Sequence, residues 1–244
     1  MLQTTRGILL RSIKYGETSL ICSFFTEVYG VQSYIAQGVR TAKARQQRAG
    51  LLQPASLLEL TVYYKPQQNL QRLREFQPAY IYTSLQEEVV KNSVALFSVE
   101  LLLRLLPEHA PIPELFELVY EYFTQLDKAP VEEVGNYPMY FMMLCSHILG
   151  YKIIGNYSED TPYLDLAAGA FSSHPPPLHA TLSTEDARLM DSFLSVNSTG
   201  DLKNISLSSS TRNRLLDWYL EFMHRHTQHM GTIRSLEVLR TILH

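Results

Sequence analysis

The sequence predicts an α+β protein of more than one domain, in which a small β-barrel precedes an all-α helical region. Two observations predict this fold class. Up to about residue 78 the apolar residues form short runs, rich in β-branched and aromatic side chains and separated by turn residues, which is typical of strands. Beyond Pro78 the apolar residues recur at helical spacing instead. With 244 residues the chain is long enough for one large or two modest domains.

Five strands are expected in the first part, at residues 6–13, 19–26, 31–36, 57–64 and 70–76. The second of them contains the run Ile21, Cys22, Phe24 and Phe25, which indicates nearly complete burial at one of its ends. Short strands joined by turns of this kind predict a small closed or partly closed barrel.

Helices are expected at residues 84–106, 114–126, 137–149, 184–194, 211–226 and 232–243. Pro107 ends the first, Pro113 opens the second, and Ser183 is an expected N-cap of the fourth. Residues 155–183 have no sustained period and include three consecutive prolines. We therefore predict a first domain at 1–79 and a helical domain at 80–244 that carries an irregular insertion at 155–183.

The charge is distributed unevenly between these parts. Residues 1–80 contain ten Lys or Arg and four Asp or Glu, a net charge of +6, although the whole chain has a net charge of −3. Arg40, Lys43, Arg45 and Arg48 lie in one short loop, and no acid occurs between Glu27 and Glu59. Such asymmetry indicates a basic module with an anionic partner and an acidic body with a different task.

The basic module is predicted to bind nucleic acid, because cations without neighbouring acids can approach a phosphate backbone. The main candidates for phosphate contacts are the four loop residues just named. Tyrosines are available for stacking on unpaired bases, and the bland alternative is a solvated loop whose tyrosines only pack. The weaker cationic candidates are Arg6, Arg11, Lys14 and Arg72, and the candidate tyrosines are Tyr15, Tyr34, Tyr63 and Tyr64.

Enzyme signatures are absent from the sequence. It contains no phosphate-binding glycine loop, no dinucleotide-binding glycine motif, no HExxH, no GxSxG and no CxxC. Relative to His224, the histidines at 226 and 229 have offsets of two and five residues, which do not place them on the same helix face as a spacing of four would. The two cysteines, Cys22 and Cys145, lie among apolar neighbours and are expected to be buried free thiols in a reducing compartment. No apolar run is long enough to cross a membrane, so a cytoplasmic location is expected.

The opening of the chain resembles that of the bacterial recombination mediator family RecO. The segments TRGILLR (5–11) and KYGETSL (14–20), then FTE (25–27), YG (29–30) and AQGVR (36–40), follow the order and spacing of that family. LQP (52–54) and, near the other end, IRSLEVLR (233–240) continue the correspondence.

This resemblance implies an N-terminal oligonucleotide-binding (OB) barrel followed by a helical domain. It implies a protein without catalytic activity that binds single- and double-stranded DNA and anneals complementary strands. With RecR, such a protein loads RecA onto DNA coated with single-strand-binding protein (SSB). It further implies that the helical domain holds the C-terminal tail of SSB, and that the protein is associated with the nucleoid when it acts.

The chain departs from the family at one point. Many members carry a four-cysteine zinc site in the stretch that matches residues 155–183, whereas this chain has no cysteine after Cys145. The two histidines there, His174 and His179, cannot replace four thiolates. We therefore expect no structural zinc and no cofactor. The segment is instead expected to be held by apolar contacts of Tyr163, Leu164, Leu166 and Phe171.

Two other hypotheses come from different classes of protein. The first is a protein–protein adaptor whose barrel is basic but does not bind DNA at physiological salt. The second is a hydrolase or nuclease, which the absence of a credible cluster of metal-binding carboxylates disfavours. If a partner's terminal carboxylate binds to the helical half, the sequence offers several cations for it: Arg104, Lys152, Arg188, Arg212 and Arg214.

Overall fold

The computed structural model describes residues 1–41, 49–176, 182–227 and 230–243. Packing divides the chain into two compact units. The first comprises Met1–Glu87 and Val99–Lys128, and the second comprises Glu88–Ser98 and Ala129–His244. Helix α2 (Val89–Leu105) contributes residues to both units. The domain boundary expected at residue 79 stays a prediction.

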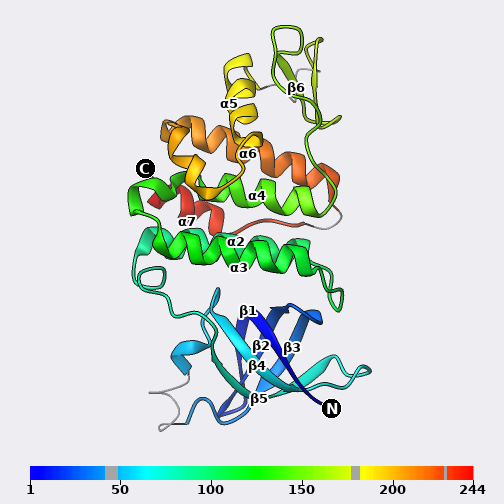
Figure 1. The fold of residues 1–244 in the computed structure, drawn as a ribbon, viewed down its shortest axis with the longest axis vertical. Helices are drawn as coiled ribbons and strands as arrows, with labels where there is room; N and C mark the ends of the chain where they lie inside the picture. Colours follow the sequence, from blue (N-terminus) through cyan, green and yellow to red (C-terminus); the bar gives the residue numbers. More distant parts are fainter. Residues whose placement is uncertain (42–48, 177–181, 228–229, 244) are drawn as a thin grey trace. The chain divides into compact units, whose positions relative to one another are not determined.

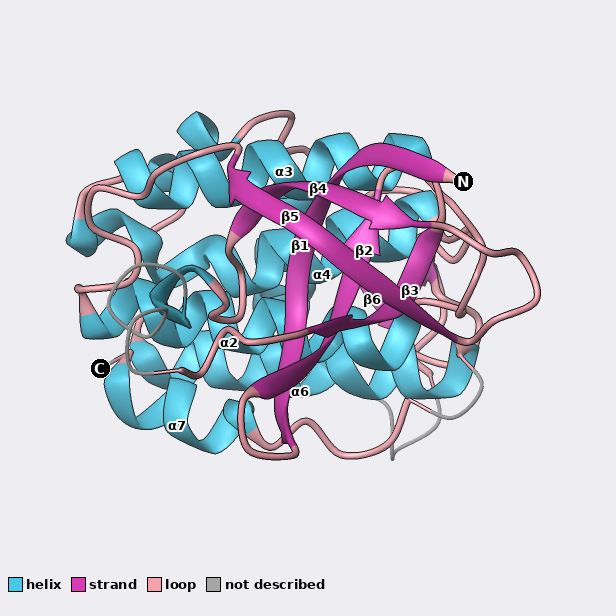
Figure 2. Ribbon diagram, turned by 90° about the horizontal axis from the view of Figure 1, so that it is seen from below, coloured by secondary structure: helices cyan, strands magenta, loops and turns pink. Residues whose placement is uncertain are grey.

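The first unit contains a closed barrel of five strands in the order β1-β2-β3-β5-β4. Neighbouring strands are antiparallel except for the parallel pair β3–β5, and Figure 2 shows β5 crossing steeply over β1 and β2. The predicted OB-type barrel is confirmed. The strands are β1 (Leu2–Tyr15), β2 (Ser19–Thr26), β3 (Gly30–Ala36), β4 (Leu57–Tyr63) and β5 (Leu70–Pro78), and the 3-10 turn η1 (Ala49–Leu51) precedes β4.

The first strand begins four residues earlier than expected, at Leu2 rather than Arg6. Its start is polar, but Leu2 to Thr5 pair with the end of β4 and so continue the ladder. The extra length matches the stagger of the barrel. The chain of paired residues around the barrel starts at Leu2 on β1 and passes through Tyr63, Arg72, Ile35 and Ile21. It returns to β1 at Ile13, which is 11 residues after Leu2. A stagger of this size tilts the strands strongly against the barrel axis.

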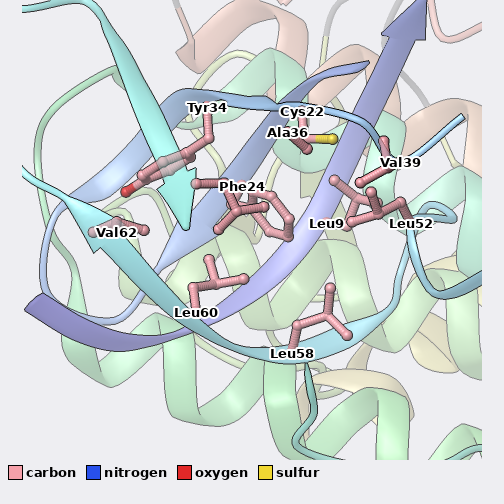
Figure 3. Packing of buried hydrophobic residues seen from close by; sticks show 11 residues of the cluster. Leu9, Cys22, Phe24, Tyr34, Ala36, Val39, Leu52, Leu58, Leu60 and Val62 are labelled. Carbon is pink, nitrogen blue, oxygen red and sulfur yellow. The ribbon is translucent and has the colours of Figure 1, made fainter. Parts of the chain in front are cut away.

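The inside of the barrel is filled by the side chains of alternate strand residues. Figure 3 shows Leu9, Phe24, Tyr34 and Leu60 converging there from four different places in the chain. Each is fully buried, and burial of one large apolar side chain contributes about 1.5–3 kcal/mol to stability. Cys22 lies in the same cluster, where burial raises the pKa of its thiol to about 12.

Helix α3 (Pro113–Lys128) covers part of the outside of the barrel, as Figure 1 shows. The ring of Phe25 on β2 meets the ring of Phe116 edge-on, with the centroids 5.5 Å apart. Because Phe24 points inward and Phe25 outward, Phe25 needs cover from outside the barrel to be fully buried, and α3 supplies part of that cover. The burial predicted for one end of β2 is therefore confirmed, and α3 explains it.

Arg6 joins β1 to α3 by charge. Its Nε donates to Oε2 of Glu27 at 3.0 Å, and its Nη1 donates to Oε2 of Glu117 on α3 at 3.2 Å. Its guanidinium carbon also lies 5.3 Å from the ring centre of Phe116 and 5.4 Å from that of Tyr120. The hydrogen bonds to the two glutamates raise the pKa of Arg6 above its usual value.

A buried carboxylate fixes the segment between the barrel and α2. Asp127 accepts hydrogen bonds from the backbone amides of Thr83, Ser84 and Leu85, at 3.0, 2.8 and 2.8 Å. Burial raises the pKa of Asp127, but these amides outweigh it and lower the pKa to about 2. The predicted helix start at Ser84 was wrong, because this cap holds residues 83–85 in a turn and α2 begins at Val89.

The second unit is mainly helical, as predicted. Apart from its part of α2, its helices are α4 (Tyr137–Ile148), α5 (Thr184–Leu194), α6 (Ser209–His226) and α7 (Ser235–Ile242), with the 3-10 helices η2 (Val131–Asn136) and η3 (Thr199–Asn204). The hydroxyls of Ser146 on α4 and Tyr219 on α6 share a hydrogen bond of 2.5 Å inside this core. Within the described ranges of the whole chain, no helix is both long and apolar enough to cross a membrane.

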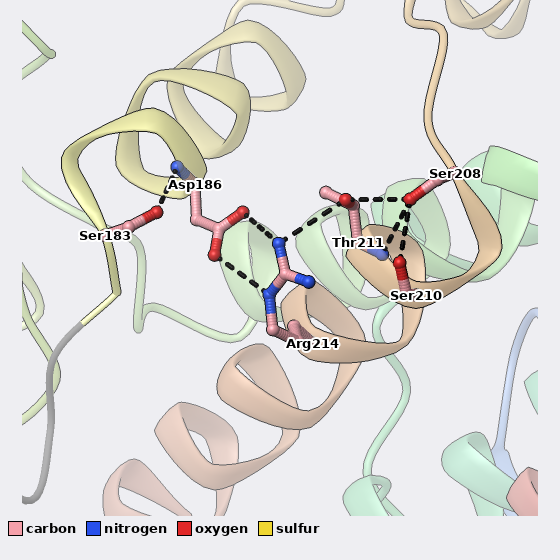
Figure 4. A network of polar contacts seen from close by, with 6 residues as sticks. All are labelled: Ser183, Asp186, Ser208, Ser210, Thr211 and Arg214. Atoms are coloured by element: carbon pink, nitrogen blue, oxygen red, sulfur yellow. Dashed lines mark hydrogen bonds and ion pairs between the residues drawn. The ribbon is translucent and has the colours of Figure 1, made fainter.

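Polar contacts join the starts of α5 and α6, as Figure 4 shows. The predicted N-cap is confirmed, since Ser183 Oγ accepts from the amide of Asp186 at 3.0 Å. The carboxylate of Asp186 in turn accepts from Nε and Nη2 of Arg214, at 3.1 and 2.9 Å. Ser208 caps α6 by accepting from the amide of Thr211 at 3.1 Å.

The segment expected to be irregular contains a short antiparallel hairpin, β6 (Tyr163–Asp165) and β7 (Ala170–Ser172). Three-residue strands are too short to give a periodic signal in sequence. Of the four apolar residues expected to hold the segment, Leu164 and Leu166 are buried, while Tyr163 and Phe171 are only half-buried. Gly169 has a φ of 61° and lies so close to the ring of Phe222 that a Cβ there would be 2.7 Å from Cε2.

The donor set of this segment does not fit a four-cysteine zinc site, because both cysteines of the chain lie elsewhere and are buried. In the part of the chain that the structure describes, no group of three or more His, Cys, Asp or Glu could hold a metal ion. His179 lies outside the described residues. That the segment folds without zinc stays a prediction, which the apolar contacts of the hairpin support.

Replacing the carboxylate of Asp127 should destabilise the protein. Asp127→Ala leaves three backbone amides without their acceptor, so the free energy of unfolding should fall by about 2–3 kcal/mol in urea denaturation. Asp160→Ala, which removes an exposed carboxylate, is the matched control and should change stability by less than about 0.5 kcal/mol.

The same variant gives a pH test. The pKa of Asp127 is about 2 in the folded chain, and about 3.9 is expected when it is unfolded. The ionised carboxylate therefore contributes roughly 2 kcal/mol above about pH 5, and this contribution disappears as the pH falls through 4 towards 2. The stability difference between wild type and Asp127→Ala should shrink over that range. A difference that stays constant down to pH 2 would contradict the role assigned to the carboxylate.

Arg6 and Arg11 lie on the same strand and should behave differently when neutralised. Arg6→Gln removes two partly exposed ion pairs, so the free energy of unfolding should fall by about 1 kcal/mol. Arg11→Gln, at an exposed position, should leave it unchanged within about 0.5 kcal/mol. Equal losses in the two variants would show that Arg6 does not hold α3 to the barrel.

Candidate nucleic-acid interface

Strand pairing places six residues from all five strands in one row across the outside of the barrel. We term this row the outer band. The centre of the row, Ile21 and Ile35, is half-buried, whereas the flanking Ile13 is 42% exposed. A contiguous exposed apolar surface rimmed by polar residues marks an interaction site. In order of pairing, the outer band consists of Ile13, Ile21, Ile35, Arg72, Tyr63 and Leu2.

The end of the outer face next to α3 is closed, and the end next to the β1–β2 turn is open. Phe25 and Val31, which pair with each other, are buried beneath α3 and the loop before it, where the amide of His109 donates to the carbonyl of Val31 at 3.0 Å. Two residues earlier on β2, Ser23 pairs with Ser33, and their hydroxyls are 3.3 Å apart. The open surface therefore begins at this serine pair and extends to the turn.

Cations gather at the open end. Arg11 lies two residues before Ile13 on β1 and so on the same face of the strand, and both Arg11 and Lys14 are exposed. Arg40 is held at the β1–β2 turn, because its amide donates to the carbonyl of Thr18 at 2.9 Å and its Nη1 to that of Gly16 at 3.1 Å. The start of the basic loop is thus fixed beside Lys14. Glu17, also exposed, is an acid in the same turn.

Arg72 lies at the other side of the outer band. Its guanidinium carbon is 5.7 Å from the ring centre of Tyr63, its partner across the β4–β5 pair. Ile13 and Arg72 are three strand spacings apart, roughly 14 Å at about 4.8 Å per spacing. Arg11 and Arg72 thus lie on the outer face of the barrel, and Arg40 lies at the β1–β2 turn. None of the predicted cations Arg11, Lys14, Arg40 and Arg72 forms an ion pair with a described carboxylate.

The other predicted cations are placed differently. Arg6 lies beside α3, where Glu27 and Glu117 already neutralise it, so its geometry favours a structural role over a DNA contact. Lys43, Arg45 and Arg48 lie outside the described residues. For these four residues, DNA contact stays a prediction.

The predicted tyrosines divide into three groups. Tyr34 cannot stack on a base, because it is fully buried in the barrel, where burial raises the pKa of its hydroxyl. Tyr15 and Tyr63 are 52% and 39% exposed and face outward near the cations. Tyr64 stacks on Tyr29, with centroids 4.1 Å apart and 19° between the planes. No pattern in the sequence singles out Tyr29, which follows the second strand in a turn.

This surface can bind a nucleic-acid strand by two means. Its cations can neutralise phosphates, which releases counterions and makes binding salt-dependent. Its exposed Tyr15, Tyr63 and Ile13 can pack against bases without reading them, so binding would not depend on sequence. Burial raises the thiol pKa values of both cysteines, and no group of three or more His, Cys, Asp or Glu among the described residues could hold a metal ion.

Comparison with known proteins covers both units. Residues 1–82 match the family model "Recombination protein O N terminal", and residues 86–236 match "Recombination protein O C terminal". The chain is 30% identical to the DNA repair protein RecO of Bacteroides fragilis over 245 residues, covering 99% of both chains. It is 29% identical to that of Phocaeicola vulgatus and 26% identical to that of Flavobacterium psychrophilum, with coverage of 99% and 98% of each chain. The barrel, the helical unit and these matches along nearly the whole length show that the chain belongs to the RecO family of DNA repair proteins.

Proposed function

We propose that this protein is a recombination mediator without catalytic activity, which binds single- and double-stranded DNA through its barrel. DNA lies against the outer band and is held by Arg11, Lys14, Arg40 and Arg72, together with Lys43, Arg45 and Arg48 of the basic loop. The observation that carries this proposal is the row of exposed and half-buried apolar and aromatic side chains, near cations that form no ion pair with a described carboxylate, on a module with a net charge of +6.

The proposed activity follows from this mode of binding. A surface that holds phosphates and packs against bases without reading them can hold any sequence, and it leaves the edges of the bases open for pairing. We propose that the protein uses this property to anneal complementary strands and, together with RecR, to load RecA onto DNA coated with SSB. It would do so in the cytoplasm, at the nucleoid.

The helical unit is proposed to hold the C-terminal tail of SSB through a cation that meets the terminal carboxylate. Arg214 is already engaged by Asp186, and Arg104 belongs to the first unit, where it lies 3.9 Å from Glu100. Lys152 and Arg188 are exposed, while Arg212 is half-buried and donates to the carbonyl of Leu243 at 3.4 Å. The structure thus favours Lys152, Arg188 and Arg212 over the other two cations that the sequence offered.

DNA binding can be tested by fluorescence anisotropy with a labelled single-stranded oligonucleotide over a series of salt concentrations. In the face variant, Arg11, Lys14 and Arg72 are changed to alanine. In the loop variant, Arg40, Lys43, Arg45 and Arg48 are changed to alanine. Each lost phosphate contact should lower the slope of log K against log salt by about 0.7, so we expect reductions of about 2 for the face variant and about 3 for the loop variant.

The matched control changes Lys152, Arg188 and Lys203, three exposed cations of the second unit, to alanine and should leave the slope unchanged. If wild type does not bind even at low salt, the proposal fails and the adaptor hypothesis, in which the basic barrel serves protein partners only, takes its place. If the slope of log K against log salt falls as much for the control variant as for the face variant, the total charge of the protein governs binding rather than this surface. The oligonucleotide should stay intact with Mg²⁺ or EDTA, whereas metal-dependent cleavage would indicate a nuclease.

A further inference from the structure

Beside the outer band, the rim of the barrel carries an open groove of about 790 Å³. Three separate segments line it: the start of β1, the turn between β2 and β3, and the loop after β4. None of the cations considered so far lines this groove. The residues that matter for its chemistry are Gln3, Tyr29, Tyr64, Lys65, Gln67 and Gln68.

Hydrogen bonds hold the walls of this groove in place. Gln71 is only 1% exposed, and its Nε2 donates to the carbonyls of Lys65 and Gln68 at 2.7 and 2.6 Å. Its Oε1 accepts from the amide of Lys65 at 2.9 Å. The backbone of Tyr64 exchanges hydrogen bonds with Met1, at 2.9 and 3.1 Å. Because the groove is already formed without a ligand, binding does not have to order these segments, which would cost free energy.

The lining of the groove has the chemistry that a nucleobase requires. The stacked rings of Tyr29 and Tyr64 offer a flat apolar surface on which a further ring can continue the stack. The amides of Gln3, Gln67 and Gln68 can donate to and accept from the polar edge of a base. Lys65 supplies a positive charge, and no lining residue is acidic. Burial raises the pKa of Tyr29, so its hydroxyl stays neutral beside an anionic strand.

The groove is also continuous with the proposed DNA surface. Tyr63, the residue before Tyr64, belongs to the outer band and lies beneath the guanidinium of Arg72. Leu2, at the end of the outer band, stands between Met1 and Gln3, which both line the groove, so a DNA strand crossing the outer band reaches the groove where β4 ends.

We propose that the groove binds one unpaired nucleobase of a bound DNA strand, stacked on the Tyr29–Tyr64 pair, with Lys65 at a neighbouring phosphate. This inference rests on the proposed DNA binding and adds a selectivity to it. A base that is paired in a duplex must first be unpaired and unstacked to enter, so the groove favours single-stranded over double-stranded DNA.

The test compares Tyr29→Leu with wild type, using a single-stranded oligonucleotide and a duplex of the same length. Tyr29 lies in a turn whose backbone contact, from its amide to Thr26 Oγ1 at 3.1 Å, does not need the ring. Because stacking on one aromatic ring contributes a substantial share of the binding energy per base, affinity for the single strand should fall about fivefold or more. Affinity for the duplex should change less than twofold. Tyr157→Leu, a tyrosine in a loop of the second unit, should match wild type on both.

The outcomes separate this inference from the proposed function. If Tyr29→Leu binds both ligands like wild type, or loses affinity equally for both, the groove does not hold an unpaired base, although the barrel still binds DNA. If wild type binds neither ligand, the proposed function fails as well. A second measurement avoids mutation altogether: a single-stranded oligonucleotide containing 5-iodouracil is cross-linked to wild type by light. Cross-links should map to Tyr29 or Tyr64, and cross-links that map only to other residues would overturn the inference.

Discussion

The closure of five staggered strands into a barrel is the constraint on which the rest of the structure depends. Closure fixes the register at every pair, and the register assigns each side chain to the inside or the outside. Phe24 and Leu60 thereby enter the core, while Ile13, Arg72 and Tyr63 are aligned on the outside, although 59 residues separate Ile13 from Arg72 in the chain. The interface proposed here is a consequence of that alignment rather than of any local motif.

What the barrel exposes depends equally on what α3 covers. At one end the outer face is apolar and closed, with Phe25 against Phe116 and Arg6 neutralised by Glu27 and Glu117. At the other end it is open and basic, with Arg11 and Lys14 exposed and Arg40 held to the turn. Two arginines five residues apart on one strand thus have different tasks. Arg6 stabilises the packing of a helix, and Arg11 is available to a partner.

Much of the fold could be predicted from the sequence, because local patterns determine it. The turns and β-branched runs located the five strands, and Ser183 marked a helix start correctly. The predictions that failed concern residues governed by distant partners. Ser84 does not begin a helix because Asp127, 43 residues later, caps a turn there. The hairpin β6–β7 was missed because its strands are only three residues long.

The candidate site was predicted only in part, for the same reason. Charge density alone identified the basic module, but it could not separate Arg6 from Arg11, since the carboxylate of Glu117 comes from 111 residues further along the chain. Residue type alone could not show that Tyr34 points into the core and that Tyr29, in a turn, stacks on Tyr64. Both facts depend on strand register, which no short stretch of sequence contains.

Hydrogen–deuterium exchange of the full chain, with and without a single-stranded oligonucleotide, tests most directly whether DNA lies on the open face of the barrel. The account predicts slower exchange in peptides covering residues 11–23 and 61–72, which carry four of the six residues of the outer band and the neighbouring turns. Peptides covering α5 and α6 should exchange at unchanged rates. Protection confined to the helices of the second unit, with none in the barrel, would contradict it.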